Sequence, residues 1–326
     1  MKTILVTGAG GYIGSVLVPM LLRKKYHVIA IDKFFFGDTL KKNRNLKLIN
    51  KDCRDITPKD FTNVFAVIDL VAISNDPSGE QFKKLTWNVN FVSRYNTAKL
   101  AKKYGVKRYI LPSSCSIYGF QKKIVDEKSK VNPLTTYAKA NLEAEKKIIP
   151  LGNRDFCVTV IRQATIFGLS NRMRFDLAIN GMTEGAYKNS YLPIMRDGNQ
   201  MRPLCHVKDT CRLQVRLLEI DTKKINKHIF NVGSKMCTKT IKNFAKSVKN
   251  VFKNKIDLRW YGDPDHRSYN VSFKKLSKIK FKAIYSIEYG IREILNSLKR
   301  KKIKKTKKTI TLDWYKHLDK NRKFIK

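Results

Sequence analysis

The chain has 326 residues, 42% of them hydrophobic, which is enough for one large domain, or a domain with a smaller appendage, around an ordinary core. No apolar run approaches the ~18 residues of a membrane span, and no charged leader with a cleavage site precedes the first apolar run, so we expect a cytoplasmic protein without a membrane segment. Six scattered cysteines without a Cys-x-x-Cys pair indicate neither a disulfide framework nor a zinc site, and we expect no metal.

The formal net charge of +42 raises the possibility of a nucleic-acid partner. However, only 18 of the 68 basic residues are arginine, and the lysines are spread over the whole chain, which is more typical of solvated faces than of base or phosphate recognition. We therefore do not expect nucleic acid as a partner, although a positive field favours ligands that carry phosphate. The densest basic run, residues 299–308, follows the last predicted helix and indicates a solvated, mobile segment.

The first apolar run, residues 3–7, is followed by glycines at 8, 11 and 14 and by a helical pattern. A strand that turns sharply into a helix needs glycine in the turn and where the backbone approaches a pyrophosphate, and the helix N-terminus offers free N–H groups to phosphate. A second apolar run, residues 27–32, ends in Asp32, about 20 residues further on, where a ribose-binding acid is expected. Asp32 favours NAD over NADP because it would repel a 2′-phosphate, although Lys33 beside it could offset that repulsion.

Strand-like runs alternate with helical patterns through the first half of the chain. The pattern predicts strands at 3–7, 27–32, 46–50, 65–72, 108–112 and 157–161, and helices at 13–25, 84–104 and 136–149. In the second half it predicts helices near 175–186, 207–219, 239–252 and 286–298, and strands near 192–195, 229–232 and 256–261. The expected fold is α/β, a Rossmann doubly wound parallel sheet with a smaller C-terminal substrate-binding α/β lobe. We expect the cofactor domain over 1–170, the second lobe over 171–298 with some exchange of strands and helices, and a basic C-terminal tail over 299–326.

Small hydroxyl residues follow the fifth predicted strand, and a tyrosine begins a helix shortly afterwards. Together with the other motifs, the chain resembles the extended short-chain dehydrogenase/reductases, specifically the nucleotide-sugar epimerase/dehydratase family, over about residues 1–298. The motifs that carry the resemblance are Thr7-Gly8-x-x-Gly11-Tyr12-Ile13-Gly14, Asp52-Cys53-Arg54-Asp55, Leu70-Val71-Ala72, Asn88-Val89-Asn90, Ser113-Ser114 with Tyr118-Gly119, Tyr137-Ala138-Lys139, Arg162 through Gly168, Arg202 through Val207, and Asn231-Val232-Gly233.

The resemblance implies a set of roles for individual residues. It implies that the cofactor NAD is bound by Gly8, Gly11, Tyr12, Ile13 and Gly14 at the pyrophosphate, Asp32 at the ribose, Asp52 and Cys53 at the adenine, Leu70, Val71 and Ala72 at the nicotinamide, and Asn88 at the end of the sheet. It implies that Ser114 hydrogen bonds the sugar oxygen and that Tyr137 takes or returns its proton. It implies that the substrate diphosphate meets Arg202, Arg267 and one of Arg172 and Arg174. The family also implies a homodimer through the helices at 84–104 and 136–149, which in the alternative interpretation only cover the sheet.

The sequence departs from the family one helical turn after Tyr137. A tyrosine with an ordinary pKa of ~10 is a weak base at neutral pH and needs a neighbouring cation, for which the family uses a lysine on the same helix face. This chain has Asn141 there, which could still hydrogen bond the nicotinamide ribose but brings no charge. Lys139 points to nearly the opposite side of the helix.

The reaction class follows from the residues after Ser114. The family's 4,6-dehydratases have an Asp-Glu pair there and its decarboxylases keep the Glu, whereas this chain has Cys115 and Ser116. We therefore expect an NAD-dependent epimerase, or a related oxidoreductase, that acts on a nucleotide-activated sugar through a transient keto-sugar. The alternatives are a nucleotide-sugar dehydratase or reductase and, because of Asn141, a non-catalytic NAD-binding sensor or scaffold. Cys115 is either an acid/base group or a packing residue, and His206 is expected to pack or cap a helix.

Overall fold

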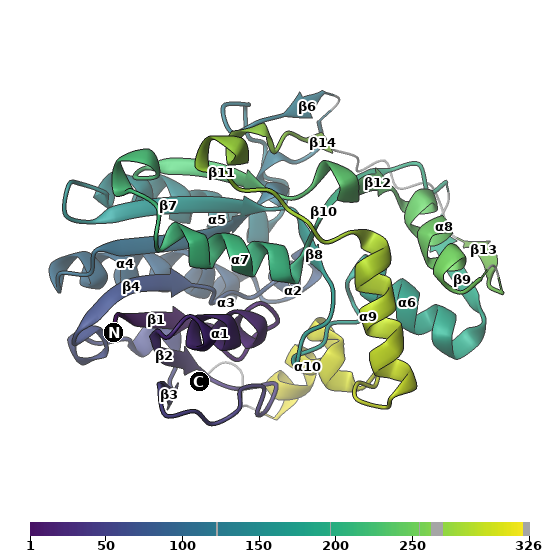
Figure 1. The fold of residues 1–326 in the computed structure, drawn as a ribbon, viewed down its shortest axis with the longest axis horizontal. Helices are drawn as coiled ribbons and strands as arrows, with labels where there is room; N and C mark the ends of the chain where they lie inside the picture. The colour runs from purple at the N-terminus through teal and green to yellow at the C-terminus, as the bar shows by residue number, and fades with distance from the viewer. Residues whose placement is uncertain (122, 196, 254, 262–269, 322–326) are drawn as a thin grey trace.

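A seven-stranded parallel sheet forms the centre of the molecule in the computed structural model, which describes residues 1–321 apart from 122, 196, 254 and 262–269 (Figure 1). The strand order is β11-β7-β5-β4-β1-β2-β3. The strands are β1 (Thr3–Thr7), β2 (His27–Asp32), β3 (Leu46–Asn50), β4 (Val64–Asp69), β5 (Arg108–Ser114), β7 (Cys157–Gln163) and β11 (His228–Val232). The order reverses between β1 and β4, so the ends of these two strands open a crevice for a ligand. The predicted Rossmann fold is confirmed.

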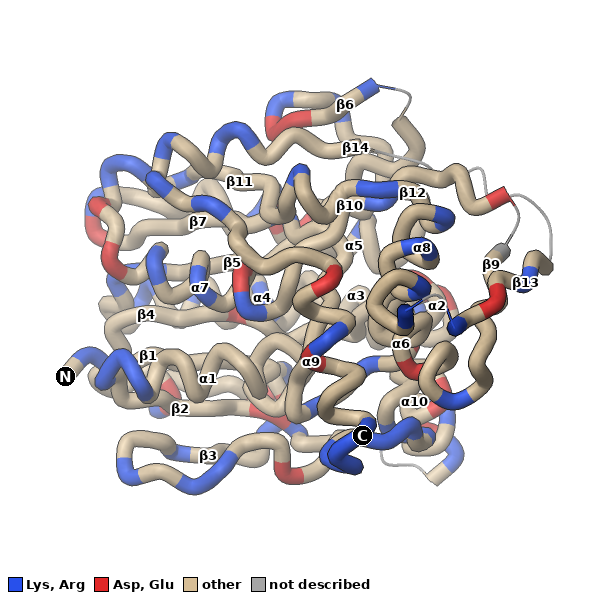
Figure 2. The backbone as a smooth tube through the Cα atoms, turned by 45° about the vertical axis from the view of Figure 1, so that its right-hand side comes forward, with Lys and Arg blue, Asp and Glu red and all other residues tan. Residues whose placement is uncertain are grey.

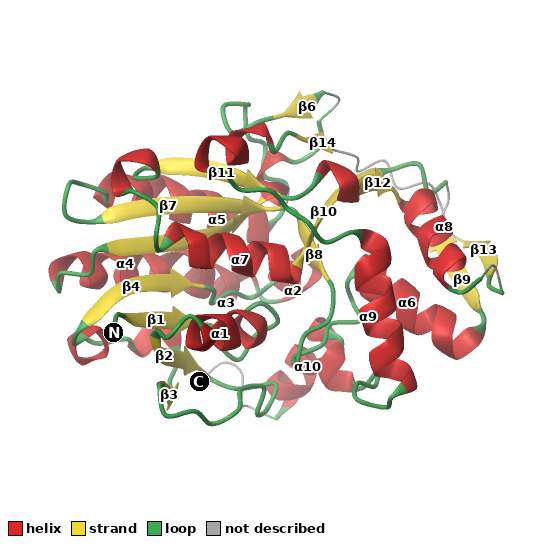
Figure 3. Cartoon of the chain, viewed as in Figure 1, coloured by secondary structure: helices red, strands yellow, loops and turns green. Residues whose placement is uncertain are grey.

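Helices cover both faces of this sheet (Figure 3). One face carries α1 (Gly14–Arg23) and α7 (Val207–Leu217), and the other carries α4 (Arg94–Lys103) and α5 (Thr136–Ile148). Because side chains alternate along a strand, Ile4 packs in the core under α1, and Leu5 packs in the core under α4 and α5. The sheet is therefore buried on both sides, as its nearly continuous apolar strands predict.

The helix expected over 84–104 consists of three pieces. A short α2 (Asp76–Gln81) precedes α3 (Lys83–Trp87), a π-helical segment η3 (Asn88–Ser93) and then α4. The wider turns of a π-helix change which side chains of the following helix face the sheet. They lead directly into Arg94, which is buried.

A second lobe lies beyond the carboxyl ends of the main strands (Figure 1). Its strands are β8 (Thr165–Phe167), β10 (Met201–His206) and β12 (Thr238–Thr240) in one sheet, β9 (Tyr191–Met195) with β13 (Asp257–Tyr261) in another, and β6 (Ile124–Val125) with β14 (Asn270–Val271) in a third. Its helices are α6 (Ala178–Asn189), α8 (Ile241–Val251) and α9 (Ile287–Lys299). Both β11 and α7 pack on or within the first lobe.

The C-terminal region contains a helix that sequence analysis missed. The lysines at 299–308 are exposed, as expected of a solvated run, but the chain then folds back as α10 (Thr311–Lys320). Tyr315 and Leu318 are buried there in an apolar cluster with Cys53 and Ile73. The basic C-terminal tail expected over 299–326 thus contains a helix that was not predicted. The helical spacing of Thr311, Tyr315 and Leu318, all buried, was the available signal.

Charge is distributed over the whole surface. Figure 2 shows Lys and Arg along nearly every element, with Asp and Glu far less frequent. Within the described residues, no helix combines the length and the apolar character that crossing a membrane requires.

Candidate active site

A cavity of about 560 Å³ lies at the carboxyl ends of β1, β4 and β5, where the second lobe faces the main sheet. It is lined by most of the residues that the resemblance implicated: Gly8, Gly11, Tyr12, Ile13, Gly14, Asp32, Asp52, Cys53, Leu70, Val71, Ala72, Ser114, Tyr137, Arg172, Arg174 and Arg202. Arg267 lies outside the described residues. Most of the cofactor and substrate residues implied by the resemblance thus surround one site at the topological switch point.

The loop after β1 forms a close-fitting turn at the N-terminus of α1. Gly8 has a φ of +63°, and a Cβ there would lie 2.7 Å from the Val71 nitrogen. A Cβ on Gly14 would lie 2.4 Å from the carbonyl oxygen of Ala9. Only glycine fits these two positions, and α1 begins directly after the turn, so that its N-terminus can favour phosphate. This cradle fits the pyrophosphate of a dinucleotide.

Asp32 and Arg172 define the far end of the cavity. The Asp32 carboxylate accepts hydrogen bonds from the Gly10 nitrogen at 2.9 Å and the Phe34 nitrogen at 2.7 Å; burial raises its pKa, and these two bonds oppose that shift. Arg172 lies 3.7 Å from the centre of the Phe36 ring, and burial lowers its pKa to about 10. Its Nη1 is buried with no hydrogen-bond partner among the described residues, so it is a donor suited to an oxygen of the bound cofactor.

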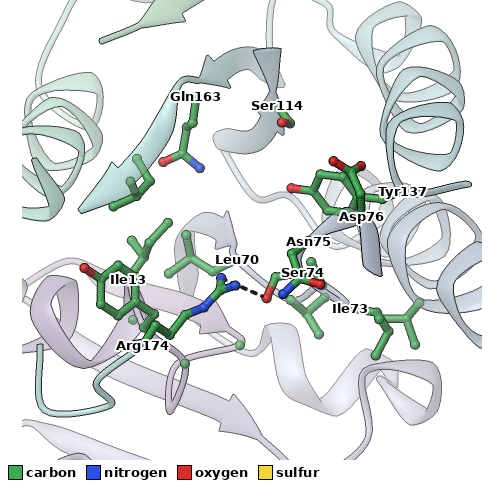
Figure 4. Close-up of a pocket in the computed structure, with 18 of the residues that line it drawn as sticks. Ile13, Leu70, Ile73, Ser74, Asn75, Asp76, Ser114, Tyr137, Gln163 and Arg174 are labelled. Carbon is green, nitrogen blue, oxygen red and sulfur yellow. Dashed lines mark hydrogen bonds between the residues drawn. The ribbon is translucent and has the colours of Figure 1, made fainter. Parts of the chain in front are cut away.

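Ser114 and Tyr137 lie together on the other side of the cavity (Figure 4). Ser114 is the last residue of β5, and Tyr137 lies in the first turn of α5, which Thr135 caps by accepting from the Ala138 nitrogen. Burial raises the pKa of Tyr137 and Asp76 raises it further, whereas a hydrogen bond with the Ser114 side chain lowers it. The pair can hold a sugar oxygen and move its proton, provided that other groups stabilise the phenolate.

Asn141 does not line the cavity. Its Oδ1 accepts from Arg94 Nη1 at 3.1 Å, and its Nδ2 donates to the Tyr137 carbonyl oxygen at 2.9 Å. The structure therefore gives no support to the expected hydrogen bond with the nicotinamide ribose, because both ends of the amide are already bonded within the protein. Lys139 is exposed, as the helix geometry predicted.

Asn88 also lies apart from the lining residues of the cavity. Asn90, two residues further on, is fully buried and forms two hydrogen bonds with the backbone of Ile73. It accepts from the Ile73 nitrogen at 2.8 Å and donates to the Ile73 carbonyl oxygen at 3.1 Å. Ile73 is itself a lining residue. Asn90 thus holds a residue of the cavity wall, whereas Asn88, expected to support the cofactor, is not among the lining residues.

The lip of the cavity joins the two lobes through residues that sequence analysis did not single out. Arg174 binds the Asp176 carboxylate at 2.6 Å and donates to the Ser74 hydroxyl at 3.2 Å. Asn75 donates to Asp176 at 3.1 Å, and Asp76, beside it, accepts from the Thr135 hydroxyl. Figure 4 shows Ser74, Asn75 and Asp76 between Arg174 and Tyr137. These polar residues follow β4 without any motif that would have identified them.

Two residues with open interpretations belong to the core. Cys115 is fully buried, its thiol contacts the Arg162 carbonyl oxygen at 3.2 Å, and burial raises its pKa, so it is a packing residue. His206 caps α7 by accepting from the Lys208 nitrogen at 3.1 Å and contacts Glu293 at 2.9 Å. Among the described residues, no group of three or more His, Cys, Asp and Glu side chains is arranged to hold a metal ion.

Comparison with known proteins identifies the family. Residues 4–233 match the NAD dependent epimerase/dehydratase family, and the chain belongs to it, which confirms the predicted family and cofactor class. It is 26% identical over 311 residues to a putative UDP-glucose 4-epimerase of Methanocaldococcus jannaschii, covering 91% of this chain and 98% of that protein. It is 30% identical over 296 residues to UDP-glucuronic acid decarboxylase 6 of Arabidopsis thaliana, covering 83% of this chain and 82% of that protein. UDP-glucuronic acid 4-epimerase from Bacillus cereus, solved with UDP-glucuronic acid and NAD, has the same fold, with a TM-score of 0.82 at 22% identity over 92% of this chain and 99% of that one.

Proposed function

We propose that this protein is an NAD-dependent epimerase of a nucleotide-activated sugar. The observation that carries the proposal is the position of Ser114 and Tyr137 in the same cavity as the glycine cradle and Asp32. A protein that only bound the dinucleotide would need the cradle and the acid but no hydroxyl pair at the other end. Arg174 and Arg202, on the side of the second lobe, provide the cations that a sugar diphosphate requires.

The chain's own residues divide the work along the cavity. When bound, NAD supplies the ability to accept and return a hydride. Gly8 through Gly14 hold the pyrophosphate, Asp32 accepts from a ribose hydroxyl, and the segment 70–72 forms the wall beside the nicotinamide. Ser114 orients the reacting sugar hydroxyl. Tyr137 removes the proton of that hydroxyl as the carbonyl forms and returns a proton after the keto-sugar has rotated in the site.

The residues after Ser114 favour epimerisation over elimination or decarboxylation. As the family resemblance implied, the elimination and decarboxylation enzymes of this family have a carboxyl group directly after the hydroxyl residue. Here Cys115 is in the core, and Ser116, a lining residue, has no charge. The similarity to a decarboxylase is therefore interpreted as shared ancestry and fold.

A panel of UDP- and dTDP-sugars, incubated with the protein and NAD and separated by chromatography, tests this proposal. We expect one of these sugars to be converted to its epimer, with no carbon dioxide or water released. Tyr137→Phe should abolish turnover while NAD binding is retained, and Lys139→Ala, an exposed change on the same helix, serves as the matched control. A decarboxylated or dehydrated product would contradict the proposal.

Three coarser features complete the proposal. The cofactor lobe is 1–170 and the substrate lobe 171–298, with 299–326 as a separate C-terminal element.

The six cysteines are all free and buried, which supports the reducing cytoplasm as the location of the protein. A homodimer through the helices at 84–104 (α3, η3 and α4) and 136–149 (α5) is supported by the partly exposed Trp87 of α3, which stacks edge-on with Phe91 at 5.4 Å. Trp87→Lys should then halve the mass measured by light scattering.

A further inference from the structure

Arg94 is a fully buried arginine next to the reaction site, with an exposed fraction of only 1%. Its Nη2 donates to the carbonyl oxygens of Asp69 at 3.0 Å and Pro112 at 2.5 Å, and its Nη1 donates to Asn141 Oδ1 at 3.1 Å. Asp69 ends β4, and Pro112 lies two residues before Ser114 at the end of β5. The guanidinium is therefore held at the edge of the sheet, just behind the segments that line the cavity.

The charge of Arg94 is paired with the buried Asp69 carboxylate on its Nε side. Its short contacts are to three neutral oxygens, whereas the Asp69 carboxylate lies 3.5 Å from its Nε. That carboxylate also accepts hydrogen bonds from the hydroxyls of Thr7 and Tyr109, which hold it in place. The Nη1 atom, which bonds Asn141, meets a neutral oxygen, and in a low-dielectric interior a charge acts over a longer range than in water.

The position of this charge fills the gap left by the missing lysine. Asn141 stands one turn after Tyr137 and presents its oxygen to Arg94, while its nitrogen bonds the Tyr137 carbonyl oxygen. We propose that Arg94, held by Asn141, is the positioning cation that favours the phenolate form of Tyr137 in this chain. It takes over from another helix the electrostatic task for which the family uses a lysine on α5. The inference rests on the proposed function only where it assigns the Tyr137 phenolate a part in catalysis; the electrostatic effect on Tyr137 does not depend on it.

Charged groups from several elements face Tyr137. Burial raises its pKa most strongly, and Asp76 of α2 adds to the rise. The Ser114 hydroxyl, Arg94 of α4 and Arg174 of the second lobe lower it. The remaining charged side chains of α2 and α3, which also pack against α5, are exposed to solvent: Glu80, Lys83 and Lys84. Arg94 and Arg174 are both buried, with exposed fractions of 1% and 8%, and Arg94 is the one that bonds Asn141.

A titration of Tyr137 in the apo-protein tests the inference without cofactor or substrate. The tyrosinate absorbance of each variant is followed against pH and compared with the same variant carrying Tyr137→Phe, which isolates this one residue. Arg94→Met should raise the midpoint by about one pH unit or more. Arg94→Met combined with Asn141→Lys should restore it, because the lysine then occupies the place that the family uses. Lys139→Met, which removes an exposed cation two residues from Tyr137, is the matched control and should leave the midpoint unchanged.

Two more variants keep the test decisive if Arg94→Met does not fold. Arg94→Lys retains the cation and should keep the wild-type midpoint, whereas Asn141→Asp adds a carboxylate facing Arg94 and should raise it. An unchanged midpoint in a folded Arg94→Met or Asn141→Asp variant would overturn the inference. So would an equal rise in Arg94→Lys, which would assign Arg94 a packing role, or an equal rise in Lys139→Met. Because the titration uses apo-protein, its outcome is independent of whether epimerase activity is found.

Discussion

The docking of α10 against the cofactor cavity leads to a quantitative prediction about Trp314. Its Nε1 donates to the Phe35 carbonyl oxygen at 2.7 Å, and Phe35 and the adjacent buried Tyr315 both line the cavity. Trp314→Ala removes this hydrogen bond, which is worth about 1 kcal/mol. The substitution also loses roughly half of the ~200 Å² of surface that a tryptophan side chain buries. At ~25 cal/mol per Å², this loss adds about 2.5 kcal/mol to the cost of the missing hydrogen bond.

A loss of this size is expected to release α10 locally and to remove Tyr315 from the wall of the cavity. We expect the dissociation constant for NAD, measured by calorimetry, to rise about tenfold or more, which corresponds to ~1.4 kcal/mol. Trypsin should then cut the exposed lysine run at 299–308 faster. Lys316→Ala, an exposed change on the same helix, should alter neither. Faster cleavage with unchanged NAD affinity would refute the placement of α10 at the cofactor, and unchanged cleavage would refute the energy assigned to Trp314.

Three further predictions concern substrate, cofactor and pH. Arg202→Ala should weaken binding of the sugar nucleotide by about 2 kcal/mol in calorimetry while NAD affinity stays near normal, because a charge-assisted bond to the diphosphate is lost; equal losses for both ligands would instead indicate a role in folding. The wild-type protein should bind NAD more tightly than NADP, and Asp32→Ala should narrow that difference in parallel titrations; NADP bound tenfold tighter by the wild type would contradict the role of Asp32. Burial alone would raise the pKa of Glu293, but hydrogen bonds from His206, Lys208 and the Leu169 nitrogen lower it below its ordinary value. The ionised Glu293 carboxylate therefore stabilises the folded protein above the unfolded-state pKa of ~4.3, and this stabilisation is lost as pH falls through the pKa of Glu293 in the folded state. In denaturant titrations, Glu293→Gln should therefore be less stable than wild type at pH ~7, with a difference that shrinks below pH ~4; a difference independent of pH would contradict this.

The first lobe could be predicted from sequence because its determinants are local. The turn at Gly8 and Gly14 tolerates no side chain, and Asp32 ends a strand whose length and apolar character define its position. The motifs around Ser114 and Tyr137 likewise mark the ends of elements that the parallel sheet brings to one edge. Each of these signals lies within a few residues of the feature that it predicts.

The features that sequence analysis missed depend on partners far apart in the chain. Arg94 and Asn141 are 47 residues apart, and nothing in either local pattern indicates that one replaces a lysine next to the other. Trp314 reaches Phe35 across 279 residues, so α10 was predicted as part of a tail although its own spacing is helical. Asn90, in the π-helical segment, bonds Ile73 of the cavity wall 17 residues away, and the motif Asn88-Val89-Asn90 does not show which of its asparagines does so.

The central claim, that Tyr137 and Ser114 serve a sugar epimerase, is tested most directly by following a label on the reacting carbon. A sugar nucleotide with deuterium on the carbinol carbon is incubated with the protein and NAD, and the products are analysed by mass spectrometry and NMR. The account predicts an epimer that keeps the deuterium at that carbon, with formation lost in Tyr137→Phe and reduced in Ser114→Ala. No turnover with any sugar nucleotide of the panel, or an epimer formed equally well by Tyr137→Phe, would contradict it.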